Sequence, residues 1–383
     1  MKLPAFSFLT AGRVIFGRST CDQVTSELRA CGRRIMLVRG RSVAWADQLE
    51  ADLNGSGALC ATAISAGEPT IDDVQQALVM GRAAKVDAVV AVGGGAVIDL
   101  GKAIAALLPA SGTILDHLEG VGGAKPLEHD PLPFVAMPTT SGTGAEVTKN
   151  AVITVPDAGR KVSLRDDRML PDVAIIDPAL TDNLPRAQTL ASGLDALTQV
   201  IEPYLSTRAN PLTDALCRDA IPRGAYALAR LAAGDDAQAR DEMAFVSLAG
   251  GLALANAGLG AVHGLAGVLG GRLGAPHGLV CGRLLGPVLS ANAEHLVQEG
   301  KETTRFDEVA DWLGSAFGID RSDVFHGLPD LLDQWRVPRL DQWIAGDVDL
   351  DAIAEEAAKA SSMKSNPCAL SSSHLVGAMR QTL

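Results

Sequence analysis

The sequence predicts an α/β domain with a parallel sheet, followed by an all-helical domain. Three observations predict this fold class. The chain has 383 residues, a length that suits two domains of ordinary size. In its first half, short β-rich runs alternate with amphipathic stretches, which is typical of a sheet with crossover helices. The second half reads as one helix after another and is rich in Ala and Leu.

The elements of the first half follow in order along the chain. Buried strands are expected at 33–40, 59–64, 86–95 and 132–140, with helices at 72–85 and 96–108. The segment DPALTDNLP (177–185) contains two prolines and is typical of a connection between domains. We therefore expect an NAD(P)-binding domain at 1–180 and an all-helical metal and substrate domain at 181–383.

Composition and charge exclude several classes of protein. With 47% hydrophobic and 20% charged residues the chain is not disordered, and its net charge of −12 disfavours a nucleic-acid partner. Six cysteines without CxxC spacing indicate a reducing compartment, and the N-terminus does not resemble a signal peptide, so a cytoplasmic protein is expected. The segment 243–271 carries no formal charge. Because it contains Asn256 and His263, we expect a buried helix pair and not a membrane span.

Two polar, glycine-containing turns indicate a nucleotide. GGGAVIDLGK (93–102) follows a strand and opens a helix, so backbone N–H groups could approach a phosphate, although the stretch is not a GxGxxG fingerprint. PTTSGTGAEVTKNAVI (138–153) follows the next strand and is rich in hydroxyls. Each stretch alone could be an ordinary tight turn. Because ligands of open parallel sheets bind at the carboxyl ends of strands, the two together favour a dinucleotide.

The end of the first strand, LVRGRS (37–42), bears on which dinucleotide binds. No acidic residue is present there to hold the ribose 2′-OH of NAD. Arg39, Gly40, Arg41 and Ser42 offer positive charge, a hydroxyl and backbone groups, which suit a 2′-phosphate, so NADP(H) is preferred to NAD(H). The alternative is a surface turn with two solvated arginines.

A metal site is suggested by acidic and imidazole side chains in apolar helices. Asp195 lies on one helical face of GLDALTQVIE (193–202) with Gln199 and Glu202. His263 lies in the charge-free segment, and His277 follows in GAPHG. An Asp and two His could hold a divalent cation with an open position. The alternative is a set of hydrogen-bonded core histidines.

At these residues the sequence resembles the iron-containing (group III) alcohol dehydrogenase family over nearly its whole length. The stretches that carry the resemblance are RVIFG (13–17), GEPT (67–70), GGGAVIDLGKAIA (93–105), PTTSGTGAEVT (138–148), LPDVAIIDPALT (170–181), GLDALTQVIE (193–202), TDAL (213–216) and NAGLGAVHG…GAPHG (256–278). The resemblance implies a dehydroquinate synthase-like architecture with the active site in the cleft between the two domains. It also implies a homodimer, with an edge strand from the N-terminal region.

The resemblance also assigns cofactor and substrate residues. It implies that NAD(P) is bound by Gly94, Gly95, Ala96, Asp99, Thr139, Thr140, Thr143 and Thr148. Lys161 is implied beside the nicotinamide ribose, and Ala96 stands where the family has a serine. Strand alternation from Thr148 puts Asn150 on the same face, from which it could reach substrate.

The resemblance implies a metal site with a departure at one ligand. The family's usual set is one Asp and three His, and Asp195, His263 and His277 match it. The remaining position is Gln199, a neutral amide and a poor ligand for Fe²⁺ or Zn²⁺. Gln199 could instead donate a hydrogen bond to the substrate oxygen. Gly267 stands where the family has a further His that helps to relay the alcohol proton.

We therefore expect an NADP(H)-preferring oxidoreductase that interconverts an alcohol and an aldehyde or ketone, with Lys161, Gln199 and Asn150 as catalytic residues. The alternative resembles maleylacetate reductases, which reduce a keto or unsaturated keto acid without metal; Lys161, Arg165 and Arg168 would supply its charges. Less favoured are a lyase similar to dehydroquinate synthases and a nucleotide-binding regulator. The expected partner is a small-molecule substrate, with neither nucleic acid nor membrane.

Overall fold

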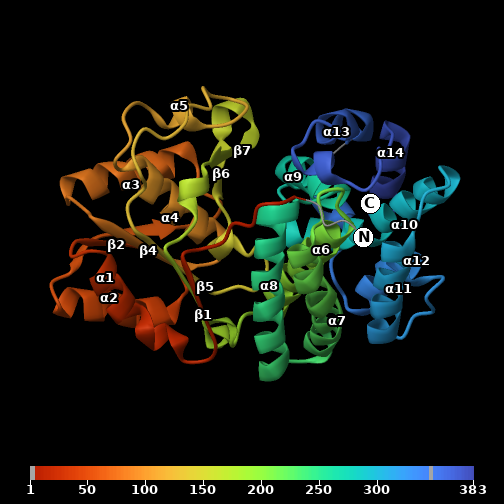
Figure 1. Cartoon of the computed structure of the whole chain (residues 1–383), viewed down its shortest axis with the longest axis horizontal. Helices are drawn as coiled ribbons and strands as arrows, with labels where there is room; N and C mark the ends of the chain where they lie inside the picture. Colours follow the sequence, from red (N-terminus) through yellow and green to blue (C-terminus); the bar gives the residue numbers. More distant parts are fainter. Residues whose placement is uncertain (1–4, 345–347) are drawn as a thin grey trace. The chain divides into compact units, whose positions relative to one another are not determined.

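The computed structural model describes residues 5–344 and 348–383 (Figure 1). The chain forms two compact units. The α/β unit comprises Leu9–Thr140 and Gly144–Asp182. The helical unit comprises Asn183–Leu383, Ser141–Thr143 and the N-terminal segment that ends at Phe8.

The α/β unit is built on a parallel sheet of six strands, as the sequence predicts. In spatial order the strands are β1 (Arg13–Phe16), β8 (Val173–Ile176), β5 (Phe134–Pro138), β4 (Ala88–Gly93), β2 (Ile35–Gly40) and β3 (Leu59–Ser65). From β2 the chain adds β3 on one side, and then β4 and β5 on the other. The direction of winding thus reverses between β2 and β4, and such a switch point is where open α/β sheets bind ligands.

Strand alternation divides the core of this unit into two layers. Met36 and Val38 of β2 pack on one face of the sheet, and Ile35 and Leu37 pack on the other. Helices α3 (Ile71–Ala83) and α4 (Gly95–Leu107) cover the first face, whereas α1 (Val24–Cys31) and α2 (Ala44–Gly55) cover the second (Figure 1). Because both faces are covered, the central strands β4 and β5 are apolar and buried throughout.

Two strands, β7 (Arg160–Arg165) and β8, have no counterpart in the sequence prediction. β6 (Asn150–Val155), which forms an antiparallel hairpin with β7, agrees with the strand alternation expected from Thr148, and β1 lies at the sheet edge, where the resemblance implies an N-terminal strand. β1 is exposed at three of its four residues and β8 has only four residues, so neither is a long apolar run. The other expected strands and both expected helices are confirmed within a few residues. A short helix, α5 (Ile114–His117), completes the α helices of this unit among the residues that the structure describes.

The helical unit has one continuous core. Its helices are α6 (Arg186–Leu205), α7 (Pro211–Ala233), α8 (Ala237–Ala257), α9 (Ala261–Leu273), α10 (His277–Gln298), α11 (Thr304–Phe317), α12 (Val324–Gln334), α13 (Leu350–Ala357) and α14 (Ser372–Arg380). The charge-free segment forms most of α8 and α9, which meet at an angle of 104°. Within the described ranges no single helix is long and apolar enough to cross a membrane, although this bent pair passes on length and composition.

Candidate functional site

The carboxyl ends of β2, β4 and β5 bring the predicted cofactor turns of the α/β unit side by side. The backbone N–H of Thr139 donates to the carbonyl of Gly93 at 3.0 Å. A Cβ atom on Gly94 would lie 3.2 Å from the Thr140 hydroxyl oxygen, so the two turns approach closely. Helix α4 begins at Gly95, and no side chain caps it. The N–H groups of its first turn therefore suit a phosphate.

Arg39, at the end of β2, is already paired inside the α/β unit. Its guanidinium is buried and lies 2.6 Å from a carboxylate oxygen of Asp47 and 2.9 Å from one of Glu50. The guanidinium is therefore not solvated, and its charge is neutralised before any phosphate arrives. Arg41 and Ser42 are exposed in the turn that follows.

A buried lysine holds the predicted residues Thr148 and Asn150 in place. The Lys102 ammonium donates to the Thr148 hydroxyl at 2.8 Å and to the Asn150 carbonyl at 2.9 Å. A carboxylate oxygen of Asp99 accepts the Val152 N–H at 3.0 Å. Burial lowers the pKa of Lys102 to about 8 and raises the pKa of Asp99 to about 6. We did not single out Lys102 from the sequence; a lysine inside the apolar stretch 96–108 was the available signal.

A second carboxyl lies buried near this lysine. Glu146 is only 2% exposed, and burial raises its pKa to about 7 against the smaller, opposing influence of the Lys102 charge. The α/β unit therefore contains two acidic groups and one lysine whose ordinary charges are all disfavoured by burial.

The other predicted cations of the α/β unit are ion-paired. The Lys161 ammonium lies 2.5 Å from a carboxylate oxygen of Glu68, in the GEPT stretch. Arg165 pairs with Glu119 at 3.3 Å. A metal-independent reductase would need these two cations to bind an anionic substrate. In the structure each of them is already paired with a carboxylate.

Arg168 is paired in the same way. Its guanidinium lies 2.9 Å from a carboxylate oxygen of Asp166 and 3.2 Å from one of Asp130. These partners raise the pKa of Arg168, so its charge is strongly stabilised where it stands. Nothing in these contacts supports a role for Arg168 in binding an acidic substrate.

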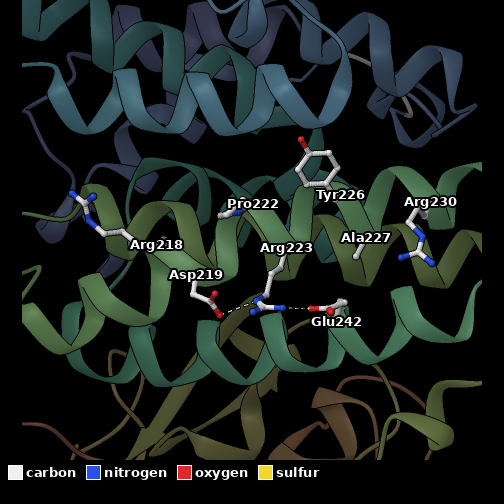
Figure 2. A pocket seen from close by; sticks show the side chains of 8 residues that line it. All are labelled: Arg218, Asp219, Pro222, Arg223, Tyr226, Ala227, Arg230 and Glu242. Carbon is white, nitrogen blue, oxygen red and sulfur yellow. Dashed lines mark hydrogen bonds and ion pairs between the residues drawn. The ribbon is translucent and has the colours of Figure 1, made fainter.

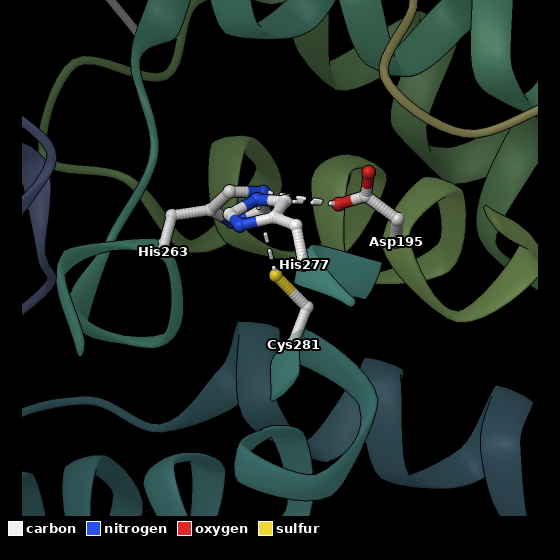
Figure 3. A group of neighbouring side chains, drawn as sticks. All are labelled: Asp195, His263, His277 and Cys281. Atoms are coloured by element: carbon white, nitrogen blue, oxygen red, sulfur yellow. Dashed lines mark hydrogen bonds and ion pairs between the residues drawn. The ribbon is translucent and has the colours of Figure 1, made fainter. Parts of the chain in front are cut away.

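In the helical unit the structure brings Asp195, His263 and His277 together with Cys281, which the sequence analysis did not consider (Figure 3). One ligand atom from each side chain lies within 4.8 Å of the others. Asp195 comes from α6, His263 from α9, and His277 and Cys281 from α10. Cys281 follows His277 by four residues, one helical turn, and that spacing was the sequence signal for it.

Glycine in α10 allows this close approach of helices. A Cβ atom on Gly278 would lie 2.1 Å from the Ala191 carbonyl oxygen and 3.0 Å from the Cβ of Asp195. Any larger residue would push α10 away from α6. His277, as the first residue of α10, therefore stands beside Asp195 because Gly278 follows it.

Glu202, three residues or just under one turn further along α6 than the predicted Gln199, orients His263. Its Oε2 lies 2.5 Å from His263 Nδ1, while its Oε1 accepts the Val262 N–H at 2.7 Å, near the start of α9. A carboxylate accepts a proton and does not donate one, so Nδ1 carries the hydrogen. In the neutral imidazole the ring's Nε2, directed at Asp195, then has a lone pair for a ligand.

The cluster contains buried polar atoms that its own members do not satisfy. Asp195 Oδ1 and His263 Nε2 lie 3.4 Å apart, yet neither has a hydrogen-bond partner among the described residues. Buried polar atoms without partners call for an explanation in a folded protein, and a bound ion is one of the usual ones. Two imidazoles, a carboxylate and a thiol are also the donor types of a divalent metal site. The residues present therefore fit a divalent cation.

The charges in the cluster support one another. The negative charge of Cys281 is the largest influence on His277 and raises its pKa to about 9. Burial alone would raise the pKa of the Cys281 thiol, but the two histidines outweigh it and lower that pKa. Burial likewise opposes the charged form of His263, yet Cys281 and Glu202 raise the pKa of this imidazole well above its usual value.

Gln199 and Gly267 occupy the positions of the predicted departures. The Gln199 amide donates to the Thr143 carbonyl at 2.7 Å, so its nitrogen is engaged by the backbone. Thr143 thus contributes its carbonyl to the helical unit. A Cβ atom at Gly267 would meet no heavy atom of the described chain within 4 Å, so no side chain fills this position.

A hollow of about 380 Å³ lies elsewhere on the helical unit, along α7 and α8 (Figure 2). Within it Arg223 pairs with Asp219 at 2.8 Å and with Glu242 at 3.1 Å. Arg230, on the same helix, pairs with Asp236. Because its arginines are paired and no predicted site residue lines it, this hollow is not the candidate active site.

Two family models match the chain, one over most of the α/β unit and one over most of the helical unit. A family model described as iron-containing alcohol dehydrogenase matches residues 11–178, and that family's C-terminal model matches 189–383. Long-chain-alcohol dehydrogenase 1 of Geobacillus thermodenitrificans is 36% identical over 282 residues, which cover 70% of this chain and 71% of that protein. The 4-hydroxybutyrate dehydrogenase of Cupriavidus necator is 33% identical over 352 residues, covering 88% and 90%.

Solved structures show the same similarity. A crystal structure of a 1,3-propanediol oxidoreductase superposes with a TM-score of 0.88 and 30% identity, covering 99% of this chain and 100% of that chain. An iron-containing alcohol dehydrogenase from Thermococcus thioreducens superposes with a TM-score of 0.86 and 25% identity, with 99% of both chains covered.

Proposed function

The chain belongs to the iron-containing alcohol dehydrogenase family, and we propose that this alcohol dehydrogenase works with NADP(H) and a divalent metal held in the helical unit. The observation that carries the metal is the cluster of Asp195, His263 and His277, with two buried ligand atoms lacking partners. The metal-independent alternative is not favoured, because its three cations are ion-paired and the relatives are alcohol dehydrogenases.

The division of roles follows from the contacts. When bound, a nicotinamide accepts or supplies the hydride and a divalent cation acts as a Lewis acid on the substrate oxygen. Asp195, His263 and His277 would hold the cation, and Glu202 keeps His263 in the tautomer that binds it. Because the Gln199 nitrogen is held by Thr143, we favour a positioning role for Gln199 over hydrogen-bond donation to substrate.

Cofactor binding is proposed for the turns at the carboxyl ends of β2, β4 and β5. Gly94, Gly95 and Ala96 would offer N–H groups to the pyrophosphate, with Thr139 and Thr140 beside them. Lys161 would contact the nicotinamide ribose. Asp99 accepts a hydrogen bond from the Val152 N–H, and the Thr148 hydroxyl accepts one from Lys102. We propose that these two residues position the loop and do not contact the pyrophosphate.

The proposed preference for NADP(H) over NAD(H) rests on binding of the 2′-phosphate by Arg41 and Ser42. Arg39 is ion-paired with Asp47 and Glu50, so we propose that the two exposed residues make the phosphate contact in its place. With these two carboxylates paired, the remaining acidic side chain of α2 is Asp52, which accepts a hydrogen bond from Gln48, and exposed Arg41 is available to bind a 2′-phosphate.

Substrate, assembly and location are proposed on narrower grounds. The names of the relatives include 4-hydroxybutyrate dehydrogenase and long-chain-alcohol dehydrogenase, so we propose as substrate a small-molecule alcohol and its aldehyde or ketone, without naming one. Exposed Val14 and Phe16 on the edge strand β1 favour a homodimer. Six free cysteines favour the cytoplasm.

The test is a coupled measurement of metal and turnover. The purified chain is loaded with Fe²⁺ or Zn²⁺ and assayed with a panel of alcohols and aldehydes, following the absorbance of reduced nicotinamide. We expect turnover that a chelator abolishes and added metal restores. Turnover that persists after complete metal removal would contradict the metal-assisted function.

A further inference from the structure

We propose that Cys281 is the fourth protein ligand of the metal centre, so that one carboxylate, two imidazoles and one thiolate hold the cation. The inference deepens the proposed function and rests on its metal. It replaces the residue expected from the sequence, Gln199, with one that comes from a different helix.

The separations between ligand atoms fit such a centre. Zinc lies about 2.0–2.1 Å from imidazole nitrogen and about 2.3 Å from thiolate sulfur, so tetrahedral ligand atoms lie roughly 3.3–3.8 Å apart. Cys281 Sγ is 3.5 Å from His277 Nε2, and Asp195 Oδ1 is 3.4 Å from His263 Nε2. His277 Nε2 lies 3.9 Å from the same oxygen. These pairs have the spacing of ligands around one ion.

The surroundings of Cys281 distinguish it from the other cysteines of the helical unit. A buried thiol usually behaves as a small apolar side chain. Cys281 is fully buried, but its sulfur points into the group of Asp195, His263 and His277 (Figure 3). Cys217 is equally buried and belongs to the same apolar core, but among the described residues it is part of no such group of ligand atoms.

Charge gives a second argument for the thiolate. A divalent cation bound by Asp195, two neutral histidines and the Gln199 amide would leave a net positive charge in a buried site. A thiolate at Cys281 makes the set of ligands and cation neutral by itself, with the Glu202 carboxylate as a further buried negative charge beside His263. Metal ligation requires this thiolate form in any case.

The position of Cys281 on α10 explains how it can take the place of Gln199 as the fourth ligand. His277 and Cys281 are one turn apart on α10, so both side chains lie on the same face of one rigid helix. The close packing of α10 on α6 through Gly278 brings that face to Asp195. A softer donor also changes selectivity, since thiolate favours Zn²⁺ over Fe²⁺ compared with an imidazole in its place.

Cobalt substitution tests the proposal directly, because thiolate ligation of Co²⁺ gives an intense near-ultraviolet charge-transfer band. The full chain is stripped with chelator and titrated with Co²⁺, as are Cys281→Ala and the matched control Cys217→Ala. We expect the band in the wild type and the control, and its loss in Cys281→Ala with roughly 100-fold weaker metal binding.

Two other outcomes would overturn the proposal. If the wild type binds stoichiometric Co²⁺ without the band, Cys281 is not a ligand, although the metal-dependent function stands. If the wild type binds no Co²⁺ or Zn²⁺, the proposed metal function fails as well.

A second variant guards against a Cys281→Ala chain that fails to fold. The double variant Gln199→His/Cys281→Ala exchanges the thiolate for an imidazole on α6. We expect it to retain metal without the charge-transfer band and to shift metal competition from Zn²⁺ towards Fe²⁺. A charge-transfer band that persists in this variant would contradict the assignment.

Discussion

The two units differ in whether their buried charged side chains have hydrogen-bond partners within the chain. In the α/β unit the Lys102 ammonium has two hydrogen-bond acceptors, and Asp99 accepts a backbone N–H. In the helical unit Asp195 Oδ1 and His263 Nε2 lie close together, and neither has a hydrogen-bond partner among the described residues. The first arrangement satisfies its charged groups within the folded chain, whereas the second leaves two ligand atoms that a cation would satisfy.

This difference shows how a binding centre can be told from a structural polar group. Both clusters are buried and both have shifted pKa values. Shifted pKa values alone therefore do not identify the metal centre. Two unsatisfied ligand atoms 3.4 Å apart do, because a buried polar atom without a partner is costly and one cation would satisfy both. His295 Nδ1 is also unsatisfied, but among the described residues it belongs to no such group of ligands.

The largest effect is expected from removing a ligand of the helical cluster. His277→Ala should lose tightly bound metal and lower turnover by roughly 1,000-fold or more, since Lewis-acid assistance is worth several kcal/mol. Elemental analysis and kcat measure the two effects. His326→Ala, which alters an exposed histidine of α12, should leave both unchanged. Full activity of His277→Ala would mean that the helical cluster, like the cluster of the α/β unit, does not bind a metal needed for turnover.

A smaller effect is expected from the carboxylate behind a ligand. Glu202→Gln removes the charge that holds the His263 tautomer and should weaken metal binding by about 10- to 100-fold. Competition with a chelator of known affinity measures this. Glu299→Gln, at an exposed position, is the control. Unchanged affinity would mean that the backbone alone orients His263.

In the α/β unit, removing a buried charge should stabilise the protein. The pKa of Glu146 is raised from 4.5 to about 7, so the folded state binds more protons than the unfolded state between these values, and stability falls as pH rises through this window. Glu146→Gln should therefore raise the free energy of unfolding by about 2 kcal/mol above pH 7, and the gain should vanish towards pH 4.5.

Denaturant unfolding at several pH values checks this, with exposed Glu355→Gln as the control. If Glu146→Gln were instead less stable at every pH, the carboxylate would be making an essential contact. The α/β cluster would then depend on its charges as much as the metal centre does.

The smallest effect concerns two arginines at the end of β2. Arg41→Ala should raise the KM for NADPH by about tenfold and change that for NADH little, as expected for the loss of one exposed phosphate contact. Arg39→Ala should instead lower thermal stability, because it leaves Asp47 and Glu50 unpaired. An equal rise in both KM values for Arg41→Ala would contradict NADP(H) preference.

Much of the fold could be predicted from the sequence, namely the parts in which a repeating pattern of apolar residues is present. The alternation of apolar runs and helices predicts the parallel sheet, and the glycine and threonine turns fall at neighbouring strand ends. Short strands such as β1 and β8 carry too few residues for a pattern to show. Their place in the sheet is set by pairing with strands distant in sequence.

The candidate site shows the same limit. Asp195, His263 and His277 were found through apolar context and family resemblance, but Cys281 was not, because a cysteine in an apolar helix is ordinary. Likewise, no sequence pattern shows that Arg39 pairs with Asp47 and Glu50 one helix later. Both facts depend on which side chains the fold brings together.

The spread of the cluster over three helices has a consequence for the lifetime of the chain. Asp195 and His263 are roughly 70 residues apart, so an ion held between them closes a long loop and acts as a reversible crosslink. Metal-loaded protein should then resist proteolysis better than chelated protein. Supply of metal would in this way decide how long each molecule survives, and not only how fast it works.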